Sequence, residues 1–211
     1  MAPFDGVLRT EAELREIIRP PGRRAAEKQI GHLDASCRAY IAHAPFVIVA
    51  TTNADGTGDA SPKGGPPGFV RVLDDRRLAM GELPGNGRVD GYRNLLANPA
   101  VGLIFLIPGV GETLRVNGRG FLVTDPAVLE ACTLDGRRPA LALGVEVVEA
   151  FIHCAKALRR ASLWEPDHWP DTADMPTIAC MLARHADIPG DPDGTLTAAA
   201  LEENYATTLW N

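Results

Sequence analysis

The sequence predicts a mainly β protein with flanking helices, in which six antiparallel strands form a small barrel. Between Phe46 and Phe121, short apolar runs alternate with turns rich in glycine, proline and asparagine. Basic residues stand beside several of these turns. Closure of a sheet removes its exposed edges, so short strands joined by tight turns favour a barrel. We therefore expect a barrel that presents cations and backbone amides to an anionic ligand.

The composition is that of an ordinary globular protein, with 45% hydrophobic and 23% charged residues in a chain of 211. The 21 lysines and arginines stand against 27 acidic residues, giving a formal charge of −6. A general nucleic-acid binder is more often basic, so we expect no nucleic-acid partner. A local positive pocket is compatible with this charge, because net charge governs solubility more than individual sites.

The sequence also argues against a membrane segment and against a metal site. No apolar run reaches the roughly 18–20 residues that would span a bilayer, and the N-terminus lacks the pattern of a signal peptide. The four cysteines are scattered and form no CxxC pair, and no two histidines stand at ligand spacing with an acid. We expect a cytoplasmic protein with reduced thiols and no metal.

An N-terminal extension, a barrel domain and a helical tail are predicted at residues 1–24, 25–164 and 165–211. In the extension, Thr10 and Glu13 have the spacing of a capping box, which starts a helix over 10–18. The tail begins with a proline-containing linker and continues with two helical stretches. Its aromatic end, Tyr205 and Trp210, is expected to pack on the barrel or on a partner subunit.

The barrel domain is expected to open with one helix over 25–43, because its apolar residues recur at three- and four-residue steps. A second, amphipathic helix is predicted over 88–97, ended by Asn98-Pro99. Strand-like segments, rich in β-branched and apolar residues and bounded by turn residues, lie at 46–52, 57–61, 69–73, 77–80, 101–107, 113–123 and 141–153.

The run Ser61-Pro62-Lys63-Gly64 offers a hydroxyl, a compact cation and a glycine that lets the backbone approach a ligand. A plain polar loop is the alternative interpretation. The run is not a Walker loop, because GxxxxGK[ST] is absent, and no GxGxxG motif followed by a suitable acid points to a Rossmann site. The segment therefore indicates anion binding of a different kind.

Two further groups of polar residues are candidates for the same ligand. Asn86 and Arg88 stand at the start of a predicted helix, where unpaired amides and an arginine fork suit a phosphate. Thr113 and Arg115 share the polar face of a predicted strand. The alternatives are a solvated surface arginine at Arg88 and a surface ion pair at Arg115, worth under about 1 kcal/mol.

Together, basic residues near three strand ends, each with a glycine turn, suit one phosphorylated aromatic cofactor. No Ser-His-Asp arrangement can be recognised, since none of the five histidines has a nucleophile in a strained elbow. The sequence therefore indicates a cofactor-binding site whose catalytic residues are unknown.

The segments SPKGG, PPGFVRVLDDRRLAM, LPGNGR, NLLANPAVGLIFLIPGVGETLRVNG and HCAKALRRASLW resemble, in this order, the pyridoxamine 5′-phosphate oxidase-like family of FMN-binding split barrels. The likeness is greatest to its bacterial flavoprotein branch and covers residues 25–164. The resemblance implies a six-stranded antiparallel split barrel and a homodimer. It also implies that FMN lies in two symmetric clefts at the subunit interface.

Carried over by position, the resemblance assigns ten cofactor-binding residues. The segment along the flavin is Ser61, Pro62, Lys63 and Gly64. Asn86 and Arg88 are expected to hold the FMN phosphate. Thr113 and Arg115 are expected to reach the cofactor, from the same or the other subunit, and the segment that closes the site holds Lys156 and Trp164.

The chain departs from the true oxidases at two points. A single Arg88 follows Asn86-Gly87 where those enzymes have a double basic pair, and the C-terminal motif that grips pyridoxal phosphate cannot be recognised. We therefore expect an FMN-dependent oxidoreductase that acts on another small-molecule substrate. The alternative is a non-catalytic protein that stores or senses FMN, haem or a deazaflavin.

Overall fold

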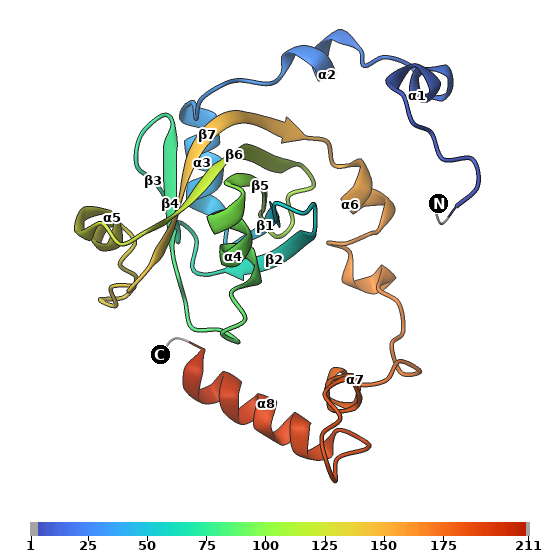
Figure 1. Ribbon diagram of the computed structural model, residues 1–211, viewed down its shortest axis with the longest axis vertical. Coiled ribbons are helices and arrows are strands. Elements are labelled where there is room, and N and C mark those ends of the chain that lie inside the picture. The colour runs from blue at the N-terminus through green and yellow to red at the C-terminus, as the bar shows by residue number, and fades with distance from the viewer. Residues whose placement is uncertain (1–3, 210–211) are drawn as a thin grey trace.

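The computed structural model describes residues 4–209, which form a curled antiparallel sheet with helices around it (Figure 1). The seven strands run in the order β2-β1-β5-β6-β7-β4-β3. Their bounds are β1 Phe46–Thr52, β2 Gly58–Gly64, β3 Val70–Val72, β4 Arg77–Gly81, β5 Ala100–Leu106, β6 Thr113–Val123 and β7 Ala142–His153. The helices are α1 Glu11–Ile17, α2 Arg23–Glu27, α3 Ala35–His43, α4 Asp90–Ala97, α5 Pro126–Ala131, α6 Lys156–Arg160, η1 Pro166–His168, α7 Ile178–His185 and α8 Thr195–Thr208.

The mainly β, antiparallel split-barrel prediction is confirmed, but the predicted number of six strands is wrong. The sheet has seven strands, one for each of the seven segments that the sequence marks as strand-like, and β4 of the β3–β4 hairpin joins β7. The sheet is not closed, since β2 and β3 stand at its two ends. An open edge at β2 leaves that strand accessible to a ligand.

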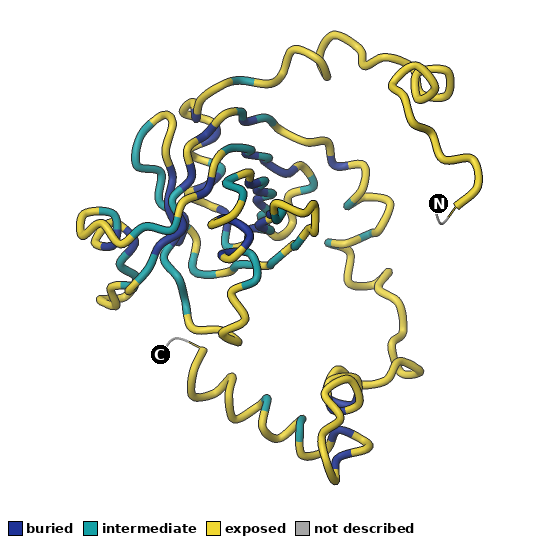
Figure 2. The backbone as a smooth tube through the Cα atoms, viewed as in Figure 1, coloured by how far each residue is buried: buried dark blue, intermediate teal, exposed yellow. Residues whose placement is uncertain are grey.

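The core lies inside the curled sheet, where the central strands β1, β5, β6 and β7 present apolar side chains. Val47 of β1 pairs with Phe105 of β5, which pairs in turn with Leu114 of β6, and all three are 0% exposed. Side chains alternate between the faces of a strand, so the neighbours of these residues point outward. Figure 2 shows the buried residues gathered at the centre of the barrel.

The prediction of one helix over residues 25–43 is wrong, because the segment divides into α2 and α3. Between them, Ile30 exchanges backbone hydrogen bonds with Ala150 of β7. Asp34 then caps α3 by accepting a hydrogen bond from the backbone N–H of Cys37 at 2.8 Å. The backbone pairing of Ile30 with β7 and the cap at Asp34 therefore divide the predicted helix into two.

The N-terminal extension and the tail stand away from the barrel, and both are mostly exposed in Figures 1 and 2. The capping box of Thr10 and Glu13 is present at the start of α1. In the tail, α7 and α8 pack on each other. Tyr205 is 55% exposed, and Trp210 lies outside the described residues.

Asp191 holds the tail hairpin together, although it lies before α8. Its carboxylate, 2% exposed, accepts hydrogen bonds from the backbone N–H groups of Leu196 and Thr197 and from the Thr197 hydroxyl. The side-chain hydrogen bond from Thr197, followed by these backbone N–H groups, lowers the pKa of Asp191. These donors favour the ionised carboxylate, so Asp191 stabilises the start of α8 most in its charged form.

We expect Asp191→Ala to reduce the helical circular dichroism signal at neutral pH, because α8 loses its N-terminal acceptor. In the unmodified chain, this stabilisation is complete above the ordinary Asp pKa of about 3.9 and is lost as pH falls through the lowered value. Acid should therefore lower the helical signal of the unmodified chain more than that of the variant. Equal helical signals for the unmodified chain and Asp191→Ala at neutral pH would contradict the role of Asp191 as the N-terminal acceptor of α8.

Candidate functional site

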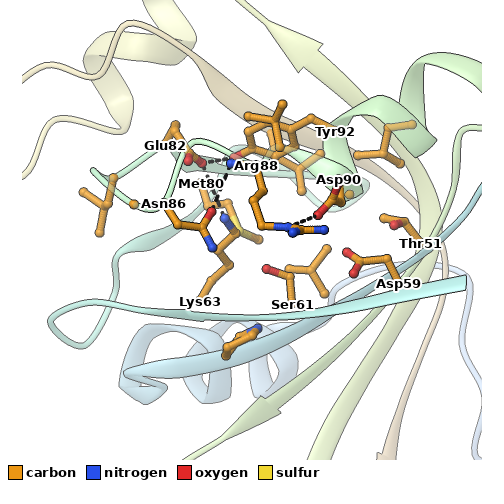
Figure 3. Close-up of a pocket in the computed structure, with 18 of the residues that line it drawn as sticks. Thr51, Asp59, Ser61, Lys63, Met80, Glu82, Asn86, Arg88, Asp90 and Tyr92 are labelled. Atoms are coloured by element: carbon orange, nitrogen blue, oxygen red, sulfur yellow. Dashed lines mark hydrogen bonds and ion pairs between the residues drawn. The ribbon is translucent and has the colours of Figure 1, made fainter. Parts of the chain in front are cut away.

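A pocket of about 460 Å³ opens beside the edge strand β2. Its walls come from β2, from the segment that follows β4, and from the first turn of α4 (Figure 3). A volume of this size lies within the range that holds small-molecule cofactors. The pocket therefore brings together three segments that are separated in sequence.

β2 lines the pocket with three polar side chains that share one face. Asp59, Ser61 and Lys63 alternate along the strand, so their side chains project to the same side. The register fixes this direction, because Ser61 pairs with Val49 and Lys63 with Val47, whose side chains lie in the core. One strand thus presents an acid, a hydroxyl and a cation in a row to the pocket.

The turn before α4 supplies the opposite wall. The Asn86 side-chain oxygen accepts a hydrogen bond from the backbone N–H of Arg88 at 3.0 Å, which leaves the amide NH₂ of Asn86 available to a ligand. Gly87 has φ +70° and Val89 has φ +52°, which is unusual for a β-branched residue. Such backbone strain is found most often at functional sites.

Lys63 is held in the pocket by two neighbours. Its Nζ lies 3.6 Å from Glu82 Oε2 and 5.3 Å from the centre of the Tyr92 ring. The Tyr92 hydroxyl donates a hydrogen bond to the same carboxylate. Burial, and then this hydrogen bond, raise the pKa of Tyr92, so its hydroxyl stays protonated. Glu82 therefore links the lysine to the tyrosine.

Arg88 points into the same pocket (Figure 3) and is paired with Asp90, whose Oδ2 lies 2.7 Å from its Nε. The hydrogen bond and charge of Asp90 raise the pKa of Arg88, with a smaller contribution from Asp59. The two cations of the pocket therefore face three carboxylates, Asp59, Glu82 and Asp90.

These ion pairs leave the cations available to a stronger anion. Both side chains of the Lys63–Glu82 pair are 31% exposed, and those of the Arg88–Asp90 pair are 74% and 39% exposed. Exposed pairs of this kind contribute about 0–1 kcal/mol. An arginine can also form charge-assisted, bidentate hydrogen bonds with a phosphate. The weak, partly exposed pairs therefore cost little to rearrange around an anionic ligand.

The structure brings six of the ten predicted site residues to this pocket: Ser61, Pro62, Lys63, Gly64, Asn86 and Arg88. The other four lie elsewhere on the same chain. Thr113 is buried on β6 opposite His153 of β7, and Arg115 lies over the ring of Phe151 at 5.2 Å. Lys156 begins α6. Trp164 donates its indole N–H to the carbonyl of Val110 at 2.9 Å.

Sequence reasoning missed the acidic half of the pocket. Asp59 could have been found, because it stands two residues before Ser61, and every second side chain of a strand projects to the same face. Glu82 and Tyr92 carry no signal in the sequence that links them to Lys63. Their contact follows from the path of the chain after β4 and from the packing of α4 on β1 and β2.

The sequence profile of pyridoxamine 5′-phosphate oxidase matches residues 33–154, which is more than half of the chain. The chain belongs to the pyridoxamine 5′-phosphate oxidase family. The matched region holds the whole pocket and all seven strands, whereas α1, α2 and the tail lie outside it. No curated protein sequence matches the chain.

Several solved structures are similar to this member of the pyridoxamine 5′-phosphate oxidase family. HupZ from Group A Streptococcus is 22% identical, with 56% of this chain and 92% of that chain covered and a TM-score of 0.45. A putative pyridoxamine 5′-phosphate oxidase from Lactobacillus delbrueckii is 20% identical, with 58% and 99% covered and a TM-score of 0.43. A protein from Clostridium acetobutylicum related to general stress protein 26 is 15% identical, with 56% and 86% covered and a TM-score of 0.43.

Two further properties concern residues 4–209. No helix in this range is long and apolar enough to span a bilayer. Within the same residues, no group of three or more His, Cys, Asp or Glu side chains lies close enough to hold a metal ion.

Proposed function

We propose that this member of the pyridoxamine 5′-phosphate oxidase family binds FMN and acts as an oxidoreductase on a small molecule. The observation that supports the proposal most is the convergence of Lys63 and Arg88 in one pocket, with Ser61 and Asn86 beside them (Figure 3). Two cations and two hydrogen-bond donors suit a phosphate dianion.

In this proposal, each side chain has a binding role. Lys63 and Arg88 neutralise the phosphate, while the Asn86 amide and the Ser61 hydroxyl donate hydrogen bonds to it. Glu82 keeps the Lys63 ammonium group near the ring of Tyr92. The isoalloxazine ring, when bound, supplies the hydride or electron transfer, and the protein orients it and excludes water.

The residues that line the pocket include neither histidine nor cysteine, and the Tyr92 hydroxyl is already a donor to Glu82. The usual protein ligands of haem iron are histidine, cysteine, methionine and tyrosine. Met80 is thus the one such side chain in the lining without a competing hydrogen bond. The donor set favours a phosphorylated flavin over haem.

We further propose a homodimer in which the second copy completes the cofactor site. Thr113, Arg115, Lys156 and Trp164 do not line the pocket of their own chain. The Nε of Arg115 is buried and has no hydrogen-bond partner among the described residues. A buried donor without an acceptor is costly, so an incoming acceptor would stabilise Arg115. In this homodimer, we assign these four residues of the second copy to the cofactor that is bound in the pocket of the first copy.

The absorption spectrum of the purified protein, followed by mass spectrometry of the released ligand, tests the proposal. We expect flavin bands and a released mass equal to that of FMN. Reduction of the bound flavin by NADH or NADPH, and its reoxidation by a second substrate, would separate an oxidoreductase from a storage or sensing protein. A protein that stays colourless after incubation with FMN would refute the proposal.

A further inference from the structure

The tail differs from the rest of the chain in charge. Residues 165–211 hold nine acidic side chains and one basic side chain, Arg184, a formal charge of −8. The whole chain has a charge of −6, so the first 164 residues carry +2. The charge asymmetry coincides with the end of the split barrel, and it indicates a contact with a basic surface.

The acidic side chains in the described part of the tail have no lysine or arginine partner. Among the described residues, no Lys or Arg forms an ion pair with any of them, and Glu165 pairs with His168 at 3.3 Å. Asp171, Asp191 and Asp193 accept hydrogen bonds from nearby backbone N–H groups. The remaining carboxylates, including Asp174, Glu202 and Glu203, are exposed.

The tail also leaves apolar surface uncovered. The hairpin of α7 and α8 buries the small residues Ala179, Cys180 and Ala183, while Ile178 and Leu182 are 64% and 44% exposed. Helices as short as α7, with eight residues, are marginal without tertiary packing. Between Asp171 and Ala206, every hydrogen bond that the tail makes stays within the tail. The hairpin therefore needs another surface.

A surface of opposite charge lies on the barrel where β7 ends and α6 begins. We call it the basic end, and its members are Lys28, Arg115, His153, Lys156, Arg159 and Arg160. The Lys28 ammonium and the Arg115 guanidinium lie 5.1 and 5.2 Å from the centre of the Phe151 ring. Burial, and then the charges of Lys28 and Arg115, lower the pKa of His153.

The basic end has cations without ion-pair partners, and exposed apolar side chains lie on the same strand, β7. Among residues 4–209, none of its lysines and arginines forms an ion pair. On β7, Val148 is 60% and Ile152 is 45% exposed. The basic end thus complements the hairpin in both charge and apolar character.

The path of the chain directs the tail away from its own basic end. After α6, the linker contains Pro166, Pro170 and Pro176, which limit its flexibility. The Trp169 indole N–H donates to the carbonyl of Leu163 at 3.2 Å and fixes the exit direction. Figure 1 shows the tail leading off from α6 and standing clear of it. A second copy of the chain offers the same basic end without this restriction.

We propose that the α7–α8 hairpin of one chain docks on the basic end of a second copy, so that two chains exchange tails in a symmetric homodimer. Each interface then occurs twice, as two-fold symmetry requires. This inference goes beyond the proposed function, because it assigns a partner to a segment that the cofactor pocket does not use.

Charge reversal on each side tests the exchange. The basic-end variant is Lys28→Glu, Arg159→Glu and Arg160→Glu, and it spares Arg115 and Lys156, which are assigned to the cofactor. The tail variant is Asp174→Lys, Glu202→Lys and Glu203→Lys, and it spares the capping carboxylates. We expect each variant alone to raise the dimer dissociation constant at least tenfold, as measured by analytical ultracentrifugation at low salt.

An equimolar mixture of the two variants should recover the dissociation constant of the unmodified chain within about threefold, because each mismatched surface then meets a matching one. This recovery also shows that both variants are folded. The matched control is Arg76→Glu with Arg77→Glu in the β3–β4 hairpin, away from α6 in Figure 1, and we expect it to dimerise normally.

Three outcomes would overturn the exchange: a monomeric unmodified chain, variants that dimerise like the unmodified chain, or a mixture that does not recover. FMN uptake is measured separately on the same samples. Loss of the exchange with intact FMN uptake would leave the proposed FMN binding standing. Loss of FMN uptake with an intact exchange would leave the exchange standing.

Discussion

Replacing Gly118 with alanine is expected to destabilise the barrel more than any other glycine substitution in β6. A Cβ atom at this position would lie 2.0 Å from the backbone carbonyl oxygen of Glu146, which no side-chain rotation can relieve. The register of β6 and β7 shifts between Asn117 and Gly118, so the two backbones approach closely at this point. The alanine methyl group must therefore push β7 away from β6.

The expected cost is about 3 kcal/mol, the upper part of the range for overpacked sites, and a melting temperature lower by roughly 6–12 °C. Thermal unfolding followed by circular dichroism measures the change. Gly58→Ala on the edge strand β2 is the matched control, because a Cβ there meets nothing within 4 Å. Equal melting temperatures for the two variants would show that the β6–β7 contact is looser than described.

Arg88→Ala is expected to weaken FMN binding at least tenfold, or about 1.4 kcal/mol. The arginine supplies a fork of donors to the phosphate, whereas alanine supplies none. Because the Arg88–Asp90 pair is largely exposed, its loss should leave the melting temperature nearly unchanged. Quenching of flavin fluorescence during titration of the apoprotein measures the dissociation constant.

Arg93→Ala is the control for this experiment. Arg93 lies on α4, five residues after Arg88, is exposed, and does not line the pocket. We expect its FMN affinity to equal that of the unmodified chain. If Arg88→Ala binds FMN as tightly as Arg93→Ala does, Arg88 has no part in holding the phosphate.

The barrel strands could be predicted from the sequence because they carry a local pattern. Residues such as Val47 and Leu114 belong to apolar runs or alternations, and turn residues bound each strand. The limits of the helix over 25–43 could not be predicted in the same way. Ile30 fits an apolar helical stripe, yet its backbone pairs with Ala150, more than a hundred residues later.

The candidate site shows the same division between local and long-range information. Lys63 and Arg88 were identified from the glycine-containing segments around them, and the resemblance to a family joined the two. The carboxylate of Glu82 was not identified, because its contacts with Lys63 and Tyr92 depend on how three segments fold together. Cations beside turns can thus be recognised in a sequence, but the partners that hold them cannot.

The proposal that Lys63 and Arg88 bind a flavin phosphate is tested most directly by comparing FMN with riboflavin, which lacks the phosphate. Charge-assisted hydrogen bonds contribute about 1.5–3 kcal/mol each. We therefore expect the unmodified apoprotein to bind FMN at least a hundredfold more tightly, a difference of about 2.7 kcal/mol. Equal dissociation constants for FMN and riboflavin would contradict the phosphate site.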